Sequence, residues 1–245
     1  MLGKALRTVE YMAGFDKAYL SEVSFGTSTD SYDAEGNVVE NVDPSLVTYE
    51  RLDNALRSFI GTVMQTPPMF SALKRDGQKL YDLARKGQII NIEPRQVTIH
   101  SIYLSRYEHN KAILQVNCSK GTYIRSLAHD LGQVLGCPSH LSALKRTSCG
   151  PFRLEDAYTL DVLDQAATEN CLERFVLPVD SGITYMPSVV LSNDDIIDIK
   201  FGRAVEHHNF LLRDGDKVRV YDEDKIFVSV CNFCQNALRP VKVFL

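Results

Sequence analysis

The sequence has 245 residues, of which 44% are hydrophobic and 24% are charged, and it carries a net charge of −4 at pH 7 and six cysteines. This composition supplies enough apolar material for packed cores and excludes a disordered chain, while the net charge excludes a protein that is basic overall but not a local basic groove. No apolar run reaches the roughly 18 residues of a membrane-spanning helix, and so few cysteines in a chain of this length favour a reducing cytoplasm over a disulfide framework.

Hydrophobic periodicity predicts an alternation of helices and strands along most of the chain. Apolar residues at helical spacing predict helices over residues 2–13, 52–60, 80–84 and 124–135. Period-two alternation predicts strands over residues 18–26, 97–104 and 112–118. The turn-forming residues of 28–36 predict a loop, and Gly136 is placed to end the last of the helices.

The character of the sequence changes near Leu177 and Pro178. Beyond this point short β-rich runs alternate with turn signals, and strands are expected over residues 218–220, 226–230 and 241–245. We therefore expect a mixed α+β domain over residues 1–177. A small, mostly β domain is expected over residues 178–245, near the lower size limit for independent folding.

The strongest local signal for chemistry lies between Cys118 and Arg125. A strand ends, the chain turns through Gly121, and a helix begins with a hydroxyl residue, Thr122, expected as its N-cap. Unpaired N–H groups make such a helix end positive, and Lys120 and Arg125 add formal charge. The place suits an anion, either an RNA phosphate or a carboxylate of the protein itself. The alternative is an ordinary capped helix whose arginine forms a surface ion pair.

Three further signals are weaker. Pro67 and Pro68 fix a stiff extended segment, either a loop laid against nucleic acid or a rigid linker. The adjacent cations Lys145 and Arg146 form either a phosphate contact or a solvated face. Tyr19 lies on the apolar side of its predicted strand, where a packing role is the simplest interpretation.

The sequence offers little for a metal or nucleotide cofactor. Cys231 and Cys234 form the only CxxC pair, but a closed zinc site needs four ligands, and the adjacent His207 and His208 do not readily supply the other two. No phosphate-binding glycine loop and no zinc-protease or serine-hydrolase motif occurs. We therefore predict no metal and no cofactor.

Four blocks, in the same order, resemble the TruB family of bacterial tRNA pseudouridine synthases. They are GFDKAY at 14–19, FG at 25–26 with TDSYDAEG at 29–36, PPMFSALK at 67–74 with LYDLARKG at 80–87, and SKGTYIRSL at 119–127 followed by DLG at 130–132, HL at 140–141 and LKR at 144–146. The segment LRPVKV at 238–243 is similar to the small PUA-like RNA-binding domain of these enzymes.

The resemblance implies an α+β fold of the pseudouridine synthase type. Its mixed, largely antiparallel sheet with flanking helices would occupy residues 1–177, and the PUA-like domain residues 178–245. The implied activity is conversion of uridine 55 in the tRNA T-loop to pseudouridine by base flipping and exchange of the glycosidic bond, without a cofactor. The implied partner is tRNA in the cytoplasm, with no membrane and no protein partner.

The resemblance also assigns roles to individual residues. Tyr19 would stack on the flipped base and help to remove a proton late in the reaction. Tyr123 and Leu144 would line the uracil pocket, and Arg125 would hold the catalytic carboxylate in its ionised form. Four basic residues are expected to contact phosphates, namely Lys74, Lys120, Lys145 and Arg146.

The sequence departs from the family in one respect. The family's nucleophilic aspartate lies in a Gly-x-Leu-Asp-Pro segment ahead of the helix that here starts at Leu2, and no such segment occurs in these 245 residues. Asp30 and Asp33 belong to another family block and are not assigned as nucleophile. We therefore expect a shortened synthase with little or no activity. The alternatives are a non-catalytic protein that binds and folds tRNA, and a protein scaffold that does not bind tRNA.

Overall fold

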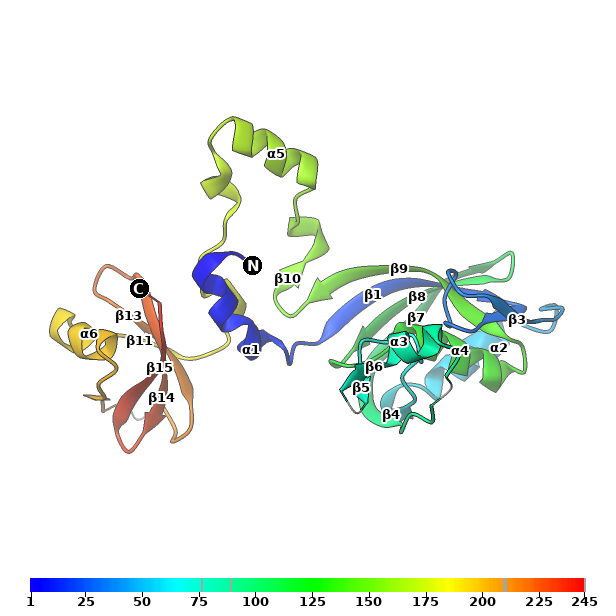
Figure 1. Ribbon diagram of the computed structural model, residues 1–245, viewed down its shortest axis with the longest axis horizontal. Coiled ribbons are helices and arrows are strands. Elements are labelled where there is room, and N and C mark those ends of the chain that lie inside the picture. The colour runs from blue at the N-terminus through cyan, green and yellow to red at the C-terminus, as the bar shows by residue number, and fades with distance from the viewer. Residues whose placement is uncertain (76, 89, 209–210, 245) are drawn as a thin grey trace. The chain divides into compact units, whose positions relative to one another are not determined.

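The computed structural model describes residues 1–75, 77–88, 90–208 and 211–244 (Figure 1). The chain forms two compact units, of which one is Gly14–Ala157 and the other combines Met1–Ala13 with Tyr158–Leu245. These limits differ from the predicted domain ranges, because the first thirteen residues pack with the C-terminal part of the chain. The functional assignment of residues 1–177 and 178–245 stays a prediction. Within the described residues, no helix has the length and apolar character needed to cross a membrane.

The unit Gly14–Ala157 is built on a six-stranded sheet in the order β10-β9-β1-β8-β7-β4, with every neighbouring pair antiparallel. Its strands are β1 (Lys17–Phe25), β4 (Gly61–Gln65), β7 (Arg95–Glu108), β8 (Lys111–Cys118), β9 (Ser139–Cys149) and β10 (Phe152–Arg153). Two short hairpins pair β2 (Thr27–Thr29) with β3 (Val38–Asn41) and β5 (Lys74–Arg75) with β6 (Gln78–Lys79). The helices are α2 (Tyr49–Arg57), α3 (Leu80–Arg85), α4 (Ile124–Leu135) and the 3₁₀ turn η2 (Leu154–Asp156).

One face of this sheet carries the hydrophobic core. Helices α2 and α4 pack on it, and side chains such as Leu52, Leu114, Leu127 and Leu131 are completely buried there. Helix α4 forms where the sequence predicts it, because its apolar residues recur at helical spacing. It ends at Gly136, whose φ of 67° lies in the left-handed region that glycine adopts without strain.

The second unit contains a five-stranded sheet in the order β11-β13-β14-β15-β12, in which only β11 and β13 run parallel among the described residues. Its strands are β11 (Ser188–Val190), β12 (Val205–Glu206), β13 (Lys217–Tyr221), β14 (Phe227–Cys234) and β15 (Ala237–Val243). The helices are η1 (Gly3–Thr8), α1 (Val9–Met12), α5 (Leu160–Thr168), η3 (Leu172–Phe175), η4 (Ser181–Ile183) and α6 (Asn193–Lys200).

The α+β class and the largely antiparallel sheets are confirmed, but several elements differ from the prediction. Strands β4 and β9 of the main sheet were not predicted. Residues 2–13 form a 3₁₀ helix followed by one short α-helical turn, because Leu2 provides no capping side chain and Gly3 takes a positive φ of 53°. The predicted strand 241–245 belongs to β15, which ends at Val243. Leu245 lies outside the described residues.

Replacement of Gly132 by alanine tests how closely α4 approaches β9. An added Cβ would lie 2.4 Å from the Ser139 Oγ and 2.6 Å from the Cys137 carbonyl oxygen, and the Ser139 hydroxyl already donates a hydrogen bond to the Ala128 carbonyl (2.6 Å). We expect Gly132→Ala to lower the free energy of unfolding by about 1–3 kcal/mol, measured by urea denaturation. Gly14→Ala, which meets no atom within 4 Å, is the control. An unchanged midpoint for Gly132→Ala would show that this helix and strand are less tightly packed.

Candidate active site

The start of α4 is fixed by a residue from a distant strand. Tyr123 is the N-cap residue, but its side chain makes no capping hydrogen bond. The buried Gln65 amide, at the end of β4, accepts a hydrogen bond from the Tyr123 N–H (2.8 Å) and donates one to the Tyr123 carbonyl (3.0 Å). The prediction of a hydroxyl N-cap at Thr122 is therefore wrong. The Thr122 hydroxyl instead donates to the Ser119 carbonyl (2.9 Å) and closes the preceding turn.

The proline-containing segment is tied to the same helix end. The Ser126 hydroxyl donates a hydrogen bond to the Thr66 carbonyl (2.7 Å), and one Nη of Arg125 donates to the Phe70 carbonyl (2.8 Å). Between these two contacts the prolines hold the chain extended. The segment is therefore a rigid support for the start of α4. This contact is compatible with both predicted roles, a loop laid against nucleic acid and a rigid linker.

An ion pair between Arg125 and Asp33 forms the centre of the site. The Nη1 of Arg125 lies 2.7 Å from the Oδ2 of Asp33, and only 24% and 23% of the two side chains are exposed. The sequence predicts an anion beside this helix end, either an RNA phosphate or a carboxylate of the protein, and the structure places a carboxylate there. Because both side chains are largely removed from water, the pair is not an ordinary surface ion pair.

Both oxygens of the Asp33 carboxylate are engaged. Oδ1 accepts hydrogen bonds from the Ser31 hydroxyl (2.5 Å) and the Glu35 N–H (3.1 Å), while Oδ2 accepts from Arg125. Burial alone would raise the pKa of the Asp33 carboxyl, but these hydrogen bonds outweigh burial and hold the pKa below its ordinary value. A carboxylate held in this way is a poor nucleophile, which supports leaving Asp33 without that role.

The ion pair lies in the wall of an open hollow of about 610 Å³. Besides residues of the loop 30–37, the hollow is lined by Phe70, Ser71, Ala72, Tyr81, Arg85, Tyr123 and Arg125. Three carboxylates, those of Asp30, Asp33 and Glu35, face two guanidiniums in this lining. Charge in the hollow is therefore nearly balanced, which suits a neutral polar molecule better than a phosphate.

Tyr19 and Leu144 lie on the sheet face that carries α4, although neither lines this hollow. In the pairing of β1 with β9, Tyr19 is opposite Arg146 and Ser21 is opposite Leu144, and residues directly opposite one another project to the same face. Tyr19 packs against the edge of the core, whereas 48% of Leu144 is exposed. Burial raises the pKa of the Tyr19 phenol, assisted by Cys118, and the Arg146 guanidinium only partly offsets this. The phenol is therefore protonated at neutral pH.

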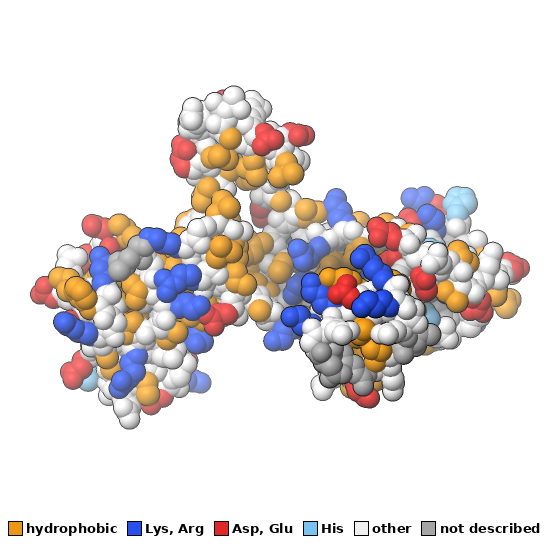
Figure 2. Space-filling model, viewed as in Figure 1, with side chains coloured by type: hydrophobic (Ala, Val, Ile, Leu, Met, Phe, Trp, Pro, Cys, Tyr) orange, Lys and Arg blue, Asp and Glu red, His pale blue; other side chains and the backbone are white. Residues whose placement is uncertain are grey.

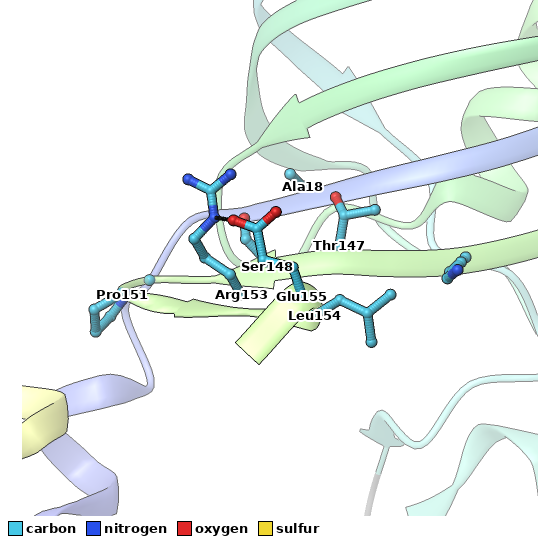
Figure 3. Close-up of a pocket in the computed structure, with 9 residues that line it drawn as sticks. Ala18, Thr147, Ser148, Pro151, Arg153, Leu154 and Glu155 are labelled. Atoms are coloured by element: carbon cyan, nitrogen blue, oxygen red, sulfur yellow. Dashed lines mark ion pairs between the residues drawn. The ribbon is translucent and has the colours of Figure 1, made fainter. Parts of the chain in front are cut away.

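Lys145 lies on the opposite face of the sheet from Tyr19. It pairs with Leu20 and lines a second hollow together with Ala18, Thr147 and Arg153, whose guanidinium forms an ion pair with Glu155 (Figure 3).

Lys74, in β5, and Lys120, in the turn before α4, are exposed. On the unit that carries α3 and α4, Lys and Arg side chains gather around a small group of acidic side chains (Figure 2). The predicted phosphate contacts of these lysines and of Arg146 stay predictions.

Several residues of the site were assigned no role from the sequence, although Asp33, Tyr81 and Arg85 lie in blocks that resemble the family. The loop 28–36 was expected from its turn formers, but nothing local connects Asp33 to an arginine 92 positions later. The same holds for Gln65, and for Tyr81 and Arg85 of α3. As for metals, no cluster of three His, Cys, Asp or Glu side chains occurs within the described part of the chain. Cys231 and Cys234 are three positions apart on β14, so their side chains project to opposite faces.

Comparison with solved structures identifies the fold. The crystal structure of a Cbf5-Nop10-Gar1 complex matches all of this chain and 71% of its own chain, with a TM-score of 0.70 at 23% sequence identity. A structure of an H/ACA ribonucleoprotein bound to a substrate RNA containing 2′-deoxyuridine matches with the same TM-score at 18% identity, over 70% of its chain. At these identities the likeness shows the fold alone.

Comparison of sequences identifies the family. Residues 1–124 match the model of the TruB family pseudouridylate synthase N-terminal domain, and residues 125–184 match the tRNA pseudouridylate synthase B C-terminal domain. A tRNA pseudouridine synthase B of Stutzerimonas stutzeri is 46% identical over 93% of this chain and 75% of its own length. One from Francisella philomiragia is 40% identical over 99% of this chain and 79% of its own length. The chain belongs to the TruB family of pseudouridine synthases, which are isomerases.

The Asp33 carboxyl provides a pH-dependent test of the ion pair. Because the pKa of Asp33 is lower in the folded state, the pair adds stability above the ordinary carboxyl pKa of about 3.9, and this stability is lost as the pH falls through the folded-state pKa. We expect Asp33→Asn to lower the free energy of unfolding at pH 7 by about 1–3 kcal/mol. The difference from the parent chain should shrink steadily as the pH falls below the ordinary carboxyl pKa, measured by urea denaturation across pH. A difference that does not change as the pH falls would contradict the assigned ion pair.

Replacement of Asp130 is expected to change stability with the opposite pH dependence to replacement of Asp33. Burial raises the pKa of this α4 carboxyl to about 6, so at pH 7 the folded state holds a charge in a poorly hydrated place. We expect Asp130→Asn to stabilise the chain above pH 6, by on the order of 1 kcal/mol because the group keeps some contact with water. Below about pH 4, where the carboxyl is protonated in both states, the gain should vanish. Loss of stability at pH 8 would show that Asp130 makes a favourable charged contact.

Proposed function

We propose that the hollow beside Arg125 holds the flipped uridine 55 of the tRNA T-loop, as part of a pseudouridine synthase that acts in the cytoplasm. The family assignment supports this proposal, because the matched relatives are named tRNA pseudouridine synthase B. The observation that carries it is the buried ion pair of Arg125 with Asp33 in the wall of the hollow.

The chemistry requires that the base leave its stack. The bond between uracil N1 and ribose C1′ breaks, the ring turns, and a bond from C5 to C1′ forms. The C5 proton is lost to water, and N1 takes up a proton in its place. A stacked base cannot turn, so the enzyme must hold the nucleotide outside the stack. A hollow with nearly balanced charge suits the neutral uracil ring, and an aromatic side chain of its lining, such as Tyr123, provides a face on which a base can stack.

Arg125 has donors to spare for a second carboxylate. A guanidinium has five N–H groups, and the two contacts with Asp33 and Phe70 leave the others free for hydrogen bonds within the site. A further carboxylate placed beside Arg125 would be kept ionised by the same charge. Since no Gly-x-Leu-Asp-Pro segment occurs in the 245 residues, we propose that this chain supplies recognition and positioning, and that bond exchange requires such a segment.

A T-arm RNA hairpin tests the recognition. We expect the chain to prefer this hairpin over one with the same stem and an unrelated loop by about tenfold, with an affinity that falls as salt rises because basic residues contact phosphates. Fluorescence anisotropy measures both. Tyr123→Ala, which removes an aromatic ring from the lining of the hollow, should remove most of the preference, whereas Tyr103→Ala, an exposed tyrosine outside this lining, should keep it. Equal affinity for the two hairpins would refute the proposal.

Release of tritium from 5-tritiated uridine in the same hairpin tests the chemistry. The chain itself is expected to release none above background. A chimera in which a Gly-x-Leu-Asp-Pro segment of a TruB relative precedes Met1 is expected to release it. Turnover by the unmodified chain would show that its nucleophile lies within these residues. Binding without turnover in the chimera would favour a non-catalytic role in tRNA binding.

A further inference from the structure

Two neighbouring residues of one loop contact two residues one turn apart on α4. Asp33 pairs with Arg125, and the ring of Tyr32 stacks on the imidazole of His129, with ring centres 3.9 Å apart and planes 13° from parallel. Positions four apart on a helix lie on the same face. The helix therefore holds this loop at two adjacent points, one electrostatic and one aromatic.

The backbone of Tyr32 explains how both side chains reach the same helix. In an extended chain, successive side chains project to opposite sides. Tyr32 has a φ of 64°, in the left-handed region that a tyrosine rarely adopts. Its carbonyl accepts a hydrogen bond from the Leu141 N–H (3.0 Å), and Asp33 forms a bridge with Leu141, so the bend is anchored to β9 as well. A strained conformation of this kind persists only where surrounding contacts hold it.

The His129 ring is suited to stacking rather than to proton exchange. Its Nδ1 is buried and has no hydrogen-bond partner in the described residues. Burial lowers the pKa of the imidazole, so the ring is neutral at pH 7. The titratable groups beside the stack are Tyr32 itself and Asp130, whose charge adds to burial in raising the pKa of the Tyr32 phenol.

We propose that Tyr32 and His129 are positioning residues, and that their stacked rings hold Asp33 against Arg125 and so set the shape of the base-holding hollow. The contact between Asp33 and Arg125 is observed in the structure, whereas the consequence for RNA recognition rests on the proposed function. Removal of either ring should free the loop to move away from α4. Asp33 would then lose its contact with Arg125 while the sheet and α4 stay folded.

The pKa of the Asp33 carboxyl, measured by carbon-13 NMR titration of the full chain without RNA, tests the first part. Tyr32→Gly is the decisive variant, because glycine favours the left-handed backbone but has no ring. We expect Tyr32→Gly and His129→Ala each to raise the pKa of Asp33 toward its ordinary value. Tyr32→Phe and His129→Phe keep a ring and should keep the parent value. So should Gln133→Ala, an exposed position four residues further along α4.

Every outcome of this titration decides the proposal. If the left-handed backbone at Tyr32 alone holds Asp33 in place, Tyr32→Gly should leave the pKa of Asp33 unchanged, because glycine favours the same backbone. That result would overturn the positioning role of the ring. Far-ultraviolet circular dichroism establishes that each variant is folded. If His129→Ala does not fold, Tyr32→Gly still decides between the two roles, because it relieves backbone strain.

The T-arm hairpin separates this proposal from the function on which its second part rests. Tyr32→Gly and His129→Ala should lower the preference for that hairpin by about tenfold, as misplacement of a positioned group does, and the two phenylalanine variants should restore it. A shifted Asp33 pKa with an unchanged preference would overturn the link to RNA. If the parent chain has no preference for the hairpin, the proposed function fails, while the titration still decides whether the rings position Asp33.

Discussion

The partly buried ion pair of Arg125 with Asp33 is the constraint that organises this site. A guanidinium withdrawn from water needs hydrogen-bond acceptors in fixed directions, and here they come from two other segments, the loop that carries Asp33 and the proline-containing segment that carries the Phe70 carbonyl. The same helix end is bound by the Gln65 side chain and by the Thr66 carbonyl, which accepts a hydrogen bond from Ser126. One charged side chain thereby joins three parts of the chain that are far apart in the sequence, and the hollow is the space that they enclose.

The site combines several locally unfavourable features, and the core beneath it compensates for them. A left-handed tyrosine, a buried imidazole nitrogen with no partner among the described residues, and a carboxyl whose pKa is raised to about 6 all lie along one side of α4. The other side of this helix is packed with fully buried leucines against an antiparallel sheet. Such a division is expected where function needs strained or charged groups, because a well-packed scaffold holds them in conformations that they would otherwise leave.

The sequence predicted the elements better than the contacts between them. Helix α4 and strands β1 and β8 follow directly from apolar periodicity, because burial on one face is a local property of the pattern. The 3₁₀ segment η1 was missed because apolar periodicity does not show that Leu2 lacks a capping side chain or that Gly3 takes a positive φ. Alternation implies that Lys145 and Arg146 face opposite ways, but only the register of β9 on β1, with its irregularity at Ala18 and Tyr19, decides which of them shares a face with Tyr19. The partner of Arg125 depends on tertiary structure and had no local signal.

The roles of the carboxylates follow from how many of their oxygens are engaged. A carboxylate that attacks a ribose carbon needs a free oxygen lone pair, and Asp33 has given both oxygens to Ser31, Glu35 and Arg125. Asp33 is therefore suited to hold the arginine, and the arginine, with N–H groups left over, is suited to hold another carboxylate. In this arrangement one acid never reacts, so that a second acid can be kept ionised at a defined place. The aromatic stack of Tyr32 on His129 is needed because the position of Asp33 fixes the position of everything that Arg125 can bind.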